Sequence, residues 1–313
     1  EKNLLYYKKY FNRYSREDVA AFSQKILEKL IIQSIKYNTK NIGEVNICLS
    51  GGTFGNVRLN QKILELKKIK NVFVMPAMSD QGLALGAATY YNSQHNFKFK
   101  RVHFNNIYLG PEFENSFIEE CLKKRSLNYS YHENIEYKIA KSIFEGKIVG
   151  RFNGRLEWGP RALGNRSILA KAENKSINTT LNKRLNRTEF MPFAPSIIFE
   201  ETKNYFNNYS EKHSCSKYMT ITYNLKNFNK KRISAVIHID NTARPQVVKV
   251  SENESYYKII ENYFKLSGIP IIVNTSFNLH EEPIVCTPND AIRAFEQKAV
   301  DILAIGNYWV EKN

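Results

Sequence analysis

Cysteine is scarce in this sequence, and long hydrophobic runs are missing from it. Only 4 of the 313 residues are Cys, and no two of them form a Cys-x-x-Cys pair, which argues against a zinc ribbon and against a disulfide framework. No stretch approaches the roughly 18 consecutive apolar residues that span a bilayer, and the first residues lack the apolar core of a signal peptide. We therefore expect reduced thiols, no membrane partner and a cytoplasmic location.

Acidic residues are fewer than basic ones. The chain has 46 Lys and Arg against 30 Asp and Glu, a formal net charge of +16, which suits phosphorylated substrates, nucleic acid or an acidic membrane surface. Lys, Asn and Ile are abundant throughout, and Lys-rich stretches are usually solvated surface. The charge therefore discriminates weakly between these partners. An initiating Met is also absent, which leads us to expect that the sequence begins inside a longer protein.

Two regions of alternating helix and strand patterns are separated by a polar, basic stretch at about 92–101. The chain is long enough for two hydrophobic cores, and we place a domain boundary in this stretch, giving domains 1–97 and 98–313. The alternation predicts an α/β fold. The pattern predicts helices at 16–37, 59–66, 82–91, 135–144 and 256–266 and one from 287, and strands at 45–49, 72–75, 148–152, 246–250, 269–273 and 302–305.

The densest group of chemistry-bearing residues lies at 154–167, directly after a predicted strand. It contains Arg155, Arg161 and Arg166 among glycines, and it ends at Ser167. Glycines let a backbone approach a ligand closely, and guanidinium groups bind phosphate or carboxylate in bidentate fashion. The composition predicts an oxyanion site or, equally well, a basic surface loop.

Further candidates lie downstream. Arg187 stands in a basic cluster that either adds to the same site or forms the solvent face of a helix end. His238 and Arg244 place an imidazole and a guanidinium in one short segment, although a lone His more often packs than reacts. Ser276 and Asn278 follow a buried strand and would point the same way if the backbone stays extended.

The first region has a glycine-rich turn between a strand and a helix. Gly51, Gly52 and Asn56 lie in this turn, whose amide groups suit a phosphate or a nucleoside. The turn lacks the Gly-Lys-Ser/Thr ending of a Walker A loop. Asp80 offers one carboxylate at a helix start, where capping is a simpler role than metal binding.

Taken in order, these segments resemble the O-carbamoyltransferases that act on nodulation factors and antibiotics. The matching segments are Gly51-Gly52 with Asn56, Pro76–Ala88, Glu157–Ser167, Pro192–Pro195, Asn274–Asn278 and Glu282–Val285. Five or more matches in order are hard to assign to chance. The resemblance implies a partial actin/Hsp70/sugar-kinase-like domain at 1–97, followed by a YrdC-like α/β domain with a twisted, open sheet at 98–313.

The resemblance also implies a reaction. The YrdC-like domain would form carbamoyl adenylate from carbamoyl phosphate and ATP with Mg²⁺, and the other domain would pass the carbamoyl group to a hydroxyl of a small-molecule or saccharide acceptor, with Fe²⁺ at the transfer site. Carried over residue by residue, the resemblance assigns phosphate binding to Arg155, Arg161, Arg166 and Ser167, and the rest of the charged pocket to Arg187, His238 and Arg244. It assigns a Ser-x-Asn element to Ser276 and Asn278, and nucleotide contacts to Gly51, Gly52, Asn56, Asn274 and Thr275. It assigns binding of the transfer-site metal to Asp80.

The sequence departs from the family pattern in two places. None of its six histidines forms the family's His-x-x-x-His metal motif, so we expect an incomplete metal site. Met191 stands where many members have Arg, which leaves open whether Arg184 or Arg187 fills the basic role. A YrdC-like protein that binds RNA or serves tRNA threonylcarbamoylation is the alternative reading, and a non-catalytic module is a third. We expect no nucleic acid partner, and a homodimer is left open.

Overall fold

The computed structural model describes residues 11–95, 104, 106–186 and 192–311. The first region contains α2 (Arg16–Asn38), β1 (Val45–Leu49), α3 (Val57–Leu64), β2 (Ile69–Val74) and α4 (Gln81–His95). The helices of the second region are α5 (Asn115–Lys124), α6 (Ile135–Phe144), α7 (Ser176–Arg184), α8 (Thr202–Tyr205), α9 (Glu254–Ser267) and α10 (Pro288–Glu296). Its strands are β3 (Tyr129–Tyr131), β4 (Val149–Phe152), β5 (Arg166–Lys171), β6 (Ala194–Ile198), β7 (Tyr223–Asn224), β8 (Thr242–Ala243), β9 (Gln246–Val248), β10 (Ile271–Ser276), β11 (Ile302–Ile305) and β12 (Tyr308–Glu311).

The first region is built on two parallel strands, β1 and β2. Helix α2 begins where the Ser15 side chain accepts the amide of Asp18, and α3 begins where the Asn56 side chain accepts the amide of Leu59. Side-chain caps of this kind satisfy amides that have no partner inside the helix. The apolar face of α3, including Ile63, packs against β2 and forms the core of this region.

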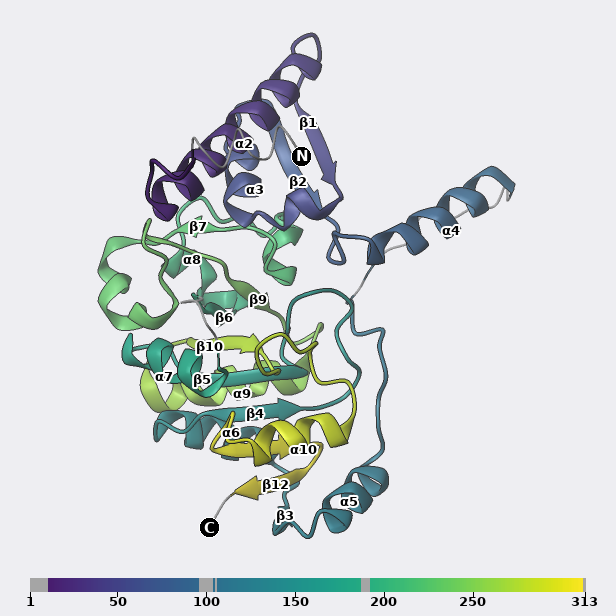
Figure 1. Cartoon of the computed structure of the whole chain (residues 1–313), viewed down its shortest axis with the longest axis vertical. Coiled ribbons are helices and arrows are strands. Elements are labelled where there is room, and N and C mark those ends of the chain that lie inside the picture. The colour runs from purple at the N-terminus through teal and green to yellow at the C-terminus, as the bar shows by residue number, and fades with distance from the viewer. Residues whose placement is uncertain (1–10, 96–103, 105, 187–191, 312–313) are drawn as a thin grey trace.

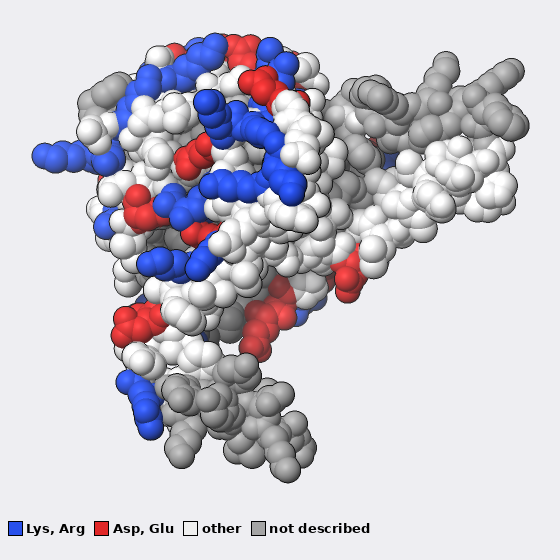
Figure 2. Space-filling model, turned by 90° about the horizontal axis from the view of Figure 1, so that it is seen from above, with Lys and Arg blue, Asp and Glu red and all other residues white. Residues whose placement is uncertain are grey.

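Helix α4 projects from the body of the molecule (Figure 1). None of its residues is buried, and Leu83, Tyr90 and Tyr91 each expose about two thirds of their surface. The helix contains no Lys, Arg, Asp or Glu, whereas Lys and Arg side chains gather over the adjoining compact part of the face seen in Figure 2. Helix α4 is therefore an arm without Lys, Arg, Asp or Glu beside a basic surface.

The second region is built on an eight-stranded mixed sheet with the order β3-β12-β11-β4-β5-β10-β6-β9. Strand β5 lies antiparallel between β4 and β10, and its register pairs Ser167 with Ser276. This pairing brings the end of the arginine-rich segment beside the end of β10, although the two are far apart in the sequence.

Helices cover both faces of this sheet (Figure 1). Helices α6 and α9 pack on each other and on β5, β6 and β10, while α10 packs on β4 and β11. Every residue of β4 is buried, and so is β5 except for Lys171. Strands buried on both faces are typical of sheets covered by helices on both sides, which confirms the predicted α/β class.

The two regions are joined by hydrogen bonds between α3 and the segment before β7. The Asn60 side chain donates to the carbonyl of Thr220 at 2.8 Å, and the Thr222 hydroxyl donates to Gln61 at 2.7 Å. Asn60 and Gln61 are both buried, so α3 is a shared structural element rather than a surface helix. In the described part of the chain, no helix has the length and apolar character needed to cross a bilayer.

Candidate functional site

A cavity of about 300 Å³ lies where segments from both regions meet. Its walls come from the start of α3, the loop before β5, the segment around β8 and the end of β10. The residues that line it are Val57, Pro160, Arg161, Ala162, Pro192, Met219, His238, Arg244, Asn274, Thr275 and Ser276. Six of the residues predicted from the sequence are therefore brought together here: Arg161, His238, Arg244, Asn274, Thr275 and Ser276.

Two guanidinium groups without a carboxylate partner give this cavity its charge. No hydrogen bond or ion pair joins Arg161 or Arg244 to another described residue, and the Nε of Arg161 is buried without a partner. Burial lowers the pKa of Arg161, and burial together with the nearby Arg161 lowers the pKa of Arg244 to about 9. Because the described lining contains no Asp or Glu, the cavity is suited to a small anion that would offset this repulsion.

Glu157 shapes the loop that carries Arg161. This buried carboxylate, 4% exposed, accepts the backbone amides of Leu163, Asn165 and Arg166 through Oε1 at 2.7, 2.8 and 3.2 Å. Three amides bound to one oxygen fix the loop's path into β5. Glu157 lies inside the arginine-rich motif, but it was not predicted as a site residue because its side chain acts on the backbone. Its place at the start of the matching segment Glu157–Ser167, as a lone acid among arginines, is the signal that points to it.

The end of β10 supplies the polar wall of the cavity. Asn274, 1% exposed, donates its amide N–H groups to Gln246 Oε1 at 2.8 Å and to Ser196 Oγ at 3.1 Å. The Ser276 hydroxyl donates to Asn278 Oδ1 at 2.6 Å. The two side chains do meet, but across a bend rather than along an extended strand, because the chain turns after Ser276 and the amide of Asn278 donates to the carbonyl of Ser276 at 3.2 Å. Asn278 does not line the cavity.

Arg155, Arg166 and Ser167 lie outside the cavity lining. The Arg155 guanidinium is exposed and donates to the carbonyl of Leu109 at 3.2 Å. Arg166 is fully buried; it stacks over Phe152 and donates to the carbonyls of Asn153 and Gly154 at 2.8 and 3.0 Å.

Ser167 accepts the backbone amide of Gly164 at 2.9 Å. The three arginines of the motif therefore take different positions, and only Arg161 faces the cavity.

The residues predicted to bind the nucleotide in the glycine-rich turn, Gly51, Gly52 and Asn56, do not line this cavity, although Val57, which follows Asn56, does. The amide of Gly51 donates to the carbonyl of Met78, and Asn56 both caps α3 and exchanges hydrogen bonds with Gln24. Gly51 has φ +104° with open space at its Cβ position. Arg187 lies outside the described residues, and Arg184 pairs with Asp301 at 2.6 Å.

No metal centre can be built from the described residues. They contain no group of three or more His, Cys, Asp or Glu that could hold a metal ion. Asp80 is exposed just before α4. The described residues therefore do not fit the metal site that the resemblance implies.

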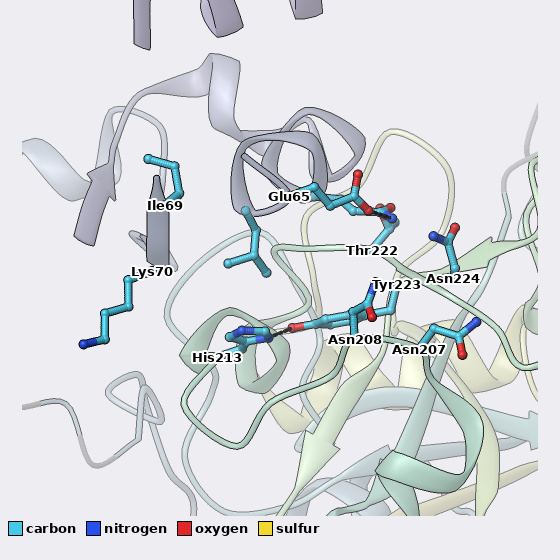
Figure 3. Close-up of a pocket in the computed structure, with 11 residues that line it drawn as sticks. Glu65, Ile69, Lys70, Asn207, Asn208, His213, Thr222, Tyr223 and Asn224 are labelled. Carbon is cyan, nitrogen blue, oxygen red and sulfur yellow. Dashed lines mark hydrogen bonds between the residues drawn. The ribbon is translucent and has the colours of Figure 1, made fainter. Parts of the chain in front are cut away.

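A larger cavity of about 480 Å³ lies between β2, α3 and the segment 207–224 (Figure 3). Its described lining is mostly neutral, with one cation, Lys70, which points away from the other side chains, and one acid, Glu65. The Nδ1 of His213 accepts the hydroxyl of Tyr223 at 3.1 Å and the amide of Ser210 at 3.3 Å. This cavity lacks convergent buried charges, so the smaller one is the better candidate for an anion site.

Two family descriptions match the chain. Residues 140–312 match the carbamoyltransferase C-terminus, and residues 2–89 match the carbamoyltransferase N-terminus. A solved structure of full-length HypF in the phosphate- and nucleotide-bound form aligns with a TM-score of 0.40 and 21% identity, covering 57% of this chain and 22% of HypF.

Curated relatives match along most of this chain. An uncharacterised protein of Methanocaldococcus jannaschii is 39% identical over 301 residues, which are 94% of this chain and 56% of the relative. The nodulation protein NolO of Bradyrhizobium diazoefficiens is 35% identical over 302 residues, which are 94% of this chain and 54% of NolO. The chain spans about half the length of these relatives. By these matches, the chain belongs to the carbamoyltransferase family.

Proposed function

We propose that this chain forms part of an ATP-dependent O-carbamoyltransferase and that its 300 Å³ cavity binds carbamoyl phosphate. The single observation that carries the proposal is the pair Arg161 and Arg244, two half-buried cations without a carboxylate partner in the described structure. Because the chain belongs to the carbamoyltransferase family, the proposed ligand carries a carbamoyl group. The phosphate group of carbamoyl phosphate would supply the missing negative charge.

The proposed reaction forms carbamoyl adenylate from carbamoyl phosphate and ATP. When both phosphate and pyrophosphate leave, one water must be consumed: it releases phosphate from carbamoyl phosphate, and the resulting carbamate oxygen displaces pyrophosphate from the α-phosphorus of ATP. Arg161 and Arg244 would hold the anions and stabilise charge that develops on their oxygens, with Mg²⁺ entering bound to ATP. No covalent intermediate with the chain is needed.

The carbamoyl group would then pass to a hydroxyl of a small-molecule or saccharide acceptor. This proposal includes a sugar-kinase-like fold for domain 1–97 and a YrdC-like fold for domain 98–313. The eight-stranded mixed sheet is compatible with a YrdC-like fold for domain 98–313. Asp80 is the residue of this chain that would contribute to holding a divalent metal, whose remaining ligands the described residues do not supply. The hydrogen bonds of α3 with the segment before β7 hold the two regions against each other, which is compatible with transfer between them.

Binding calorimetry with carbamoyl phosphate tests the anion site. We expect Arg161→Gln and Arg244→Gln each to weaken binding about tenfold or more, because each removes charge-assisted hydrogen bonds. Arg125→Gln is the matched control, since Arg125 is half-exposed and pairs with Glu296 at 3.5 Å away from the cavity. Equal affinity of all four proteins would show that the anion binds elsewhere.

Pyrophosphate release tests the chemistry separately. The whole chain with ATP and Mg²⁺ should release pyrophosphate only when carbamoyl phosphate is added, and Arg161→Gln should abolish this dependence. Release of pyrophosphate without carbamoyl phosphate, or binding of carbamoyl phosphate with no release, would contradict the proposed adenylation.

A further inference from the structure

The hydrogen bonds around His238 fix which of its ring nitrogens carries the hydrogen. His238 lines the cavity, and its Nδ1 lies 3.1 Å from the hydroxyl of Thr242. The Thr242 hydroxyl lies 2.7 Å from Asp240 Oδ1. A hydroxyl carries one hydrogen, and an ionised carboxylate can only accept. Thr242 therefore donates to Asp240 and accepts from His238, which places the ring hydrogen on Nδ1.

Asp240 is held in its acceptor role from two sides. The amide of Thr242 donates to its Oδ1 at 3.0 Å, and Arg58 from α3 pairs with its Oδ2 at 3.4 Å. Burial acts to raise the pKa of Asp240, but the hydrogen bonds from Thr242 and the charge of Arg58 outweigh it and lower the pKa. The carboxylate is thus ionised near neutral pH and can only accept. The Thr242 hydroxyl must therefore donate to Asp240, and His238 Nδ1 must donate to the Thr242 hydroxyl.

The neutral ring consequently presents a lone pair at Nε2. Burial, followed by the charge of Arg244, lowers the pKa of His238, with Asp240 opposing. No described residue donates to Nε2 in the hydrogen bonds of this segment. His238 lines the cavity together with Arg161 and Arg244, so its Nε2 would be a hydrogen-bond acceptor among charged groups that can only donate.

We infer that His238 is the specificity-determining residue that recognises the amino group of the carbamoyl moiety, with Asp240 and Thr242 positioning it. This inference rests on the proposed function. Carbamoyl phosphate carries acceptors at one end, for the arginines, and N–H donors at the other, for Nε2. Acetyl phosphate has nearly the same shape and the same phosphate, but its methyl group cannot donate. A site built to accept an N–H rejects an analogue that lacks it, because the acceptor loses its water without gaining a partner.

Binding calorimetry with carbamoyl phosphate and acetyl phosphate tests this inference on the whole chain. The wild type should bind carbamoyl phosphate about tenfold or more tightly than acetyl phosphate. His238→Phe, which keeps a planar ring, should reduce this ratio severalfold. Thr242→Val, which keeps the shape of the side chain but frees the ring tautomer, should reduce it as well, while the affinity for inorganic phosphate stays within about twofold. Thr180→Val, whose hydroxyl bonds only within α7, should leave the ratio unchanged.

Each outcome of this comparison has a separate meaning. Tight binding of both acyl phosphates with a wild-type ratio near one would overturn the inference and leave the anion site standing. A high wild-type ratio that neither His238→Phe nor Thr242→Val changes would also overturn it. Failure of carbamoyl phosphate, acetyl phosphate and inorganic phosphate alike to bind would refute the proposed function and this inference with it. The two-ligand comparison needs only the wild type, so it stands even if a variant does not fold.

Discussion

The position of single side chains determines where the anion site lies, because arginines of the same motif lie in different environments. Arg161 and Arg166 are five positions apart in the sequence, yet one faces the cavity and the other is fully buried under backbone carbonyls. Their composition predicts the same role for both. The difference arises because Arg166 begins strand β5, where the pleat turns its side chain toward Phe152, whereas Arg161 remains in the preceding loop.

Glu157→Gln should destabilise the protein and weaken carbamoyl phosphate binding together. Glu157 Oε1 accepts three backbone amides, and a neutral amide oxygen is a weaker acceptor that also brings an N–H group into the same buried space. We expect a loss of about 2 kcal/mol in the free energy of unfolding. Chemical denaturation measures this loss, with the exposed Glu145→Gln as control. If unfolding and binding both match the wild type, the loop does not depend on this carboxylate.

His238 should lower the free energy of unfolding as the pH falls below neutral. Its pKa is lowered in the folded chain below the ordinary 6.5, so the unfolded chain binds more protons in this range. The contribution of neutral His238 to the free energy of unfolding is complete above the pKa that this ring has in the unfolded chain. It is lost as the pH falls through the lower pKa of the ring in the folded chain. Between about pH 7 and about pH 5, the unfolding midpoint should fall less in His238→Phe than in the wild type. An equal fall in both proteins would show that the ring titrates normally.

At the scale of helices and strands, the sequence predicts those elements that carry their own local signals. In the structure the Ser15 side chain caps α2, Thr287 and Asp290 form a capping box at the start of α10, and Gly268 ends α9 in the left-handed conformation. Strands β5 and β6 were not predicted. Strand β5 begins with Arg166 and Ser167 and β6 contains Pro195, so neither resembles an apolar strand in sequence. Their pairing with neighbouring strands, β4 and β10 for β5 and β10 and β9 for β6, places them in the sheet.

Gly164→Ala should damage the turn that connects the cavity loop to β5. Gly164 has φ +112°, and a Cβ there would lie 2.4 Å from the ring of the buried Tyr256. Backbone strain and the clash together should lower the free energy of unfolding by about 2 kcal/mol or more. Gly86→Ala in α4 is the opposite case, because it has open space and helical geometry, and it should be neutral or slightly stabilising. Similar thermal shifts for both variants would contradict this view of the turn.

At the scale of the whole molecule, stability should be unevenly distributed. Helix α9 buries Tyr256, Ile259, Ile260 and Tyr263 completely, whereas α4 buries no residue. Helices that lack tertiary contacts open at low free-energy cost. Hydrogen–deuterium exchange should therefore be fast in peptides from α4 and slow in those from α9. Equal protection of the two helices would contradict this picture.

The arrangement of the whole chain could be predicted only in outline. The α/β class and the carbamoyltransferase family follow from motifs that remain visible in the sequence. The cavity does not, because Arg161, His238, Arg244 and Asn274 come from separate loops and from β10, and their meeting depends on strand order and on α3 packing against the second region. Sequence spacing carries no information on that packing. The division into domains 1–97 and 98–313 stays a prediction.

The most direct measurement is a crystal structure of the chain with carbamoyl phosphate bound. The account predicts phosphate oxygens within hydrogen-bonding distance of Arg161 and Arg244, and the carbamoyl nitrogen within hydrogen-bonding distance of His238 Nε2. Carbamoyl phosphate bound instead at Arg155, or in the 480 Å³ cavity near His213, would contradict the assignment of the site.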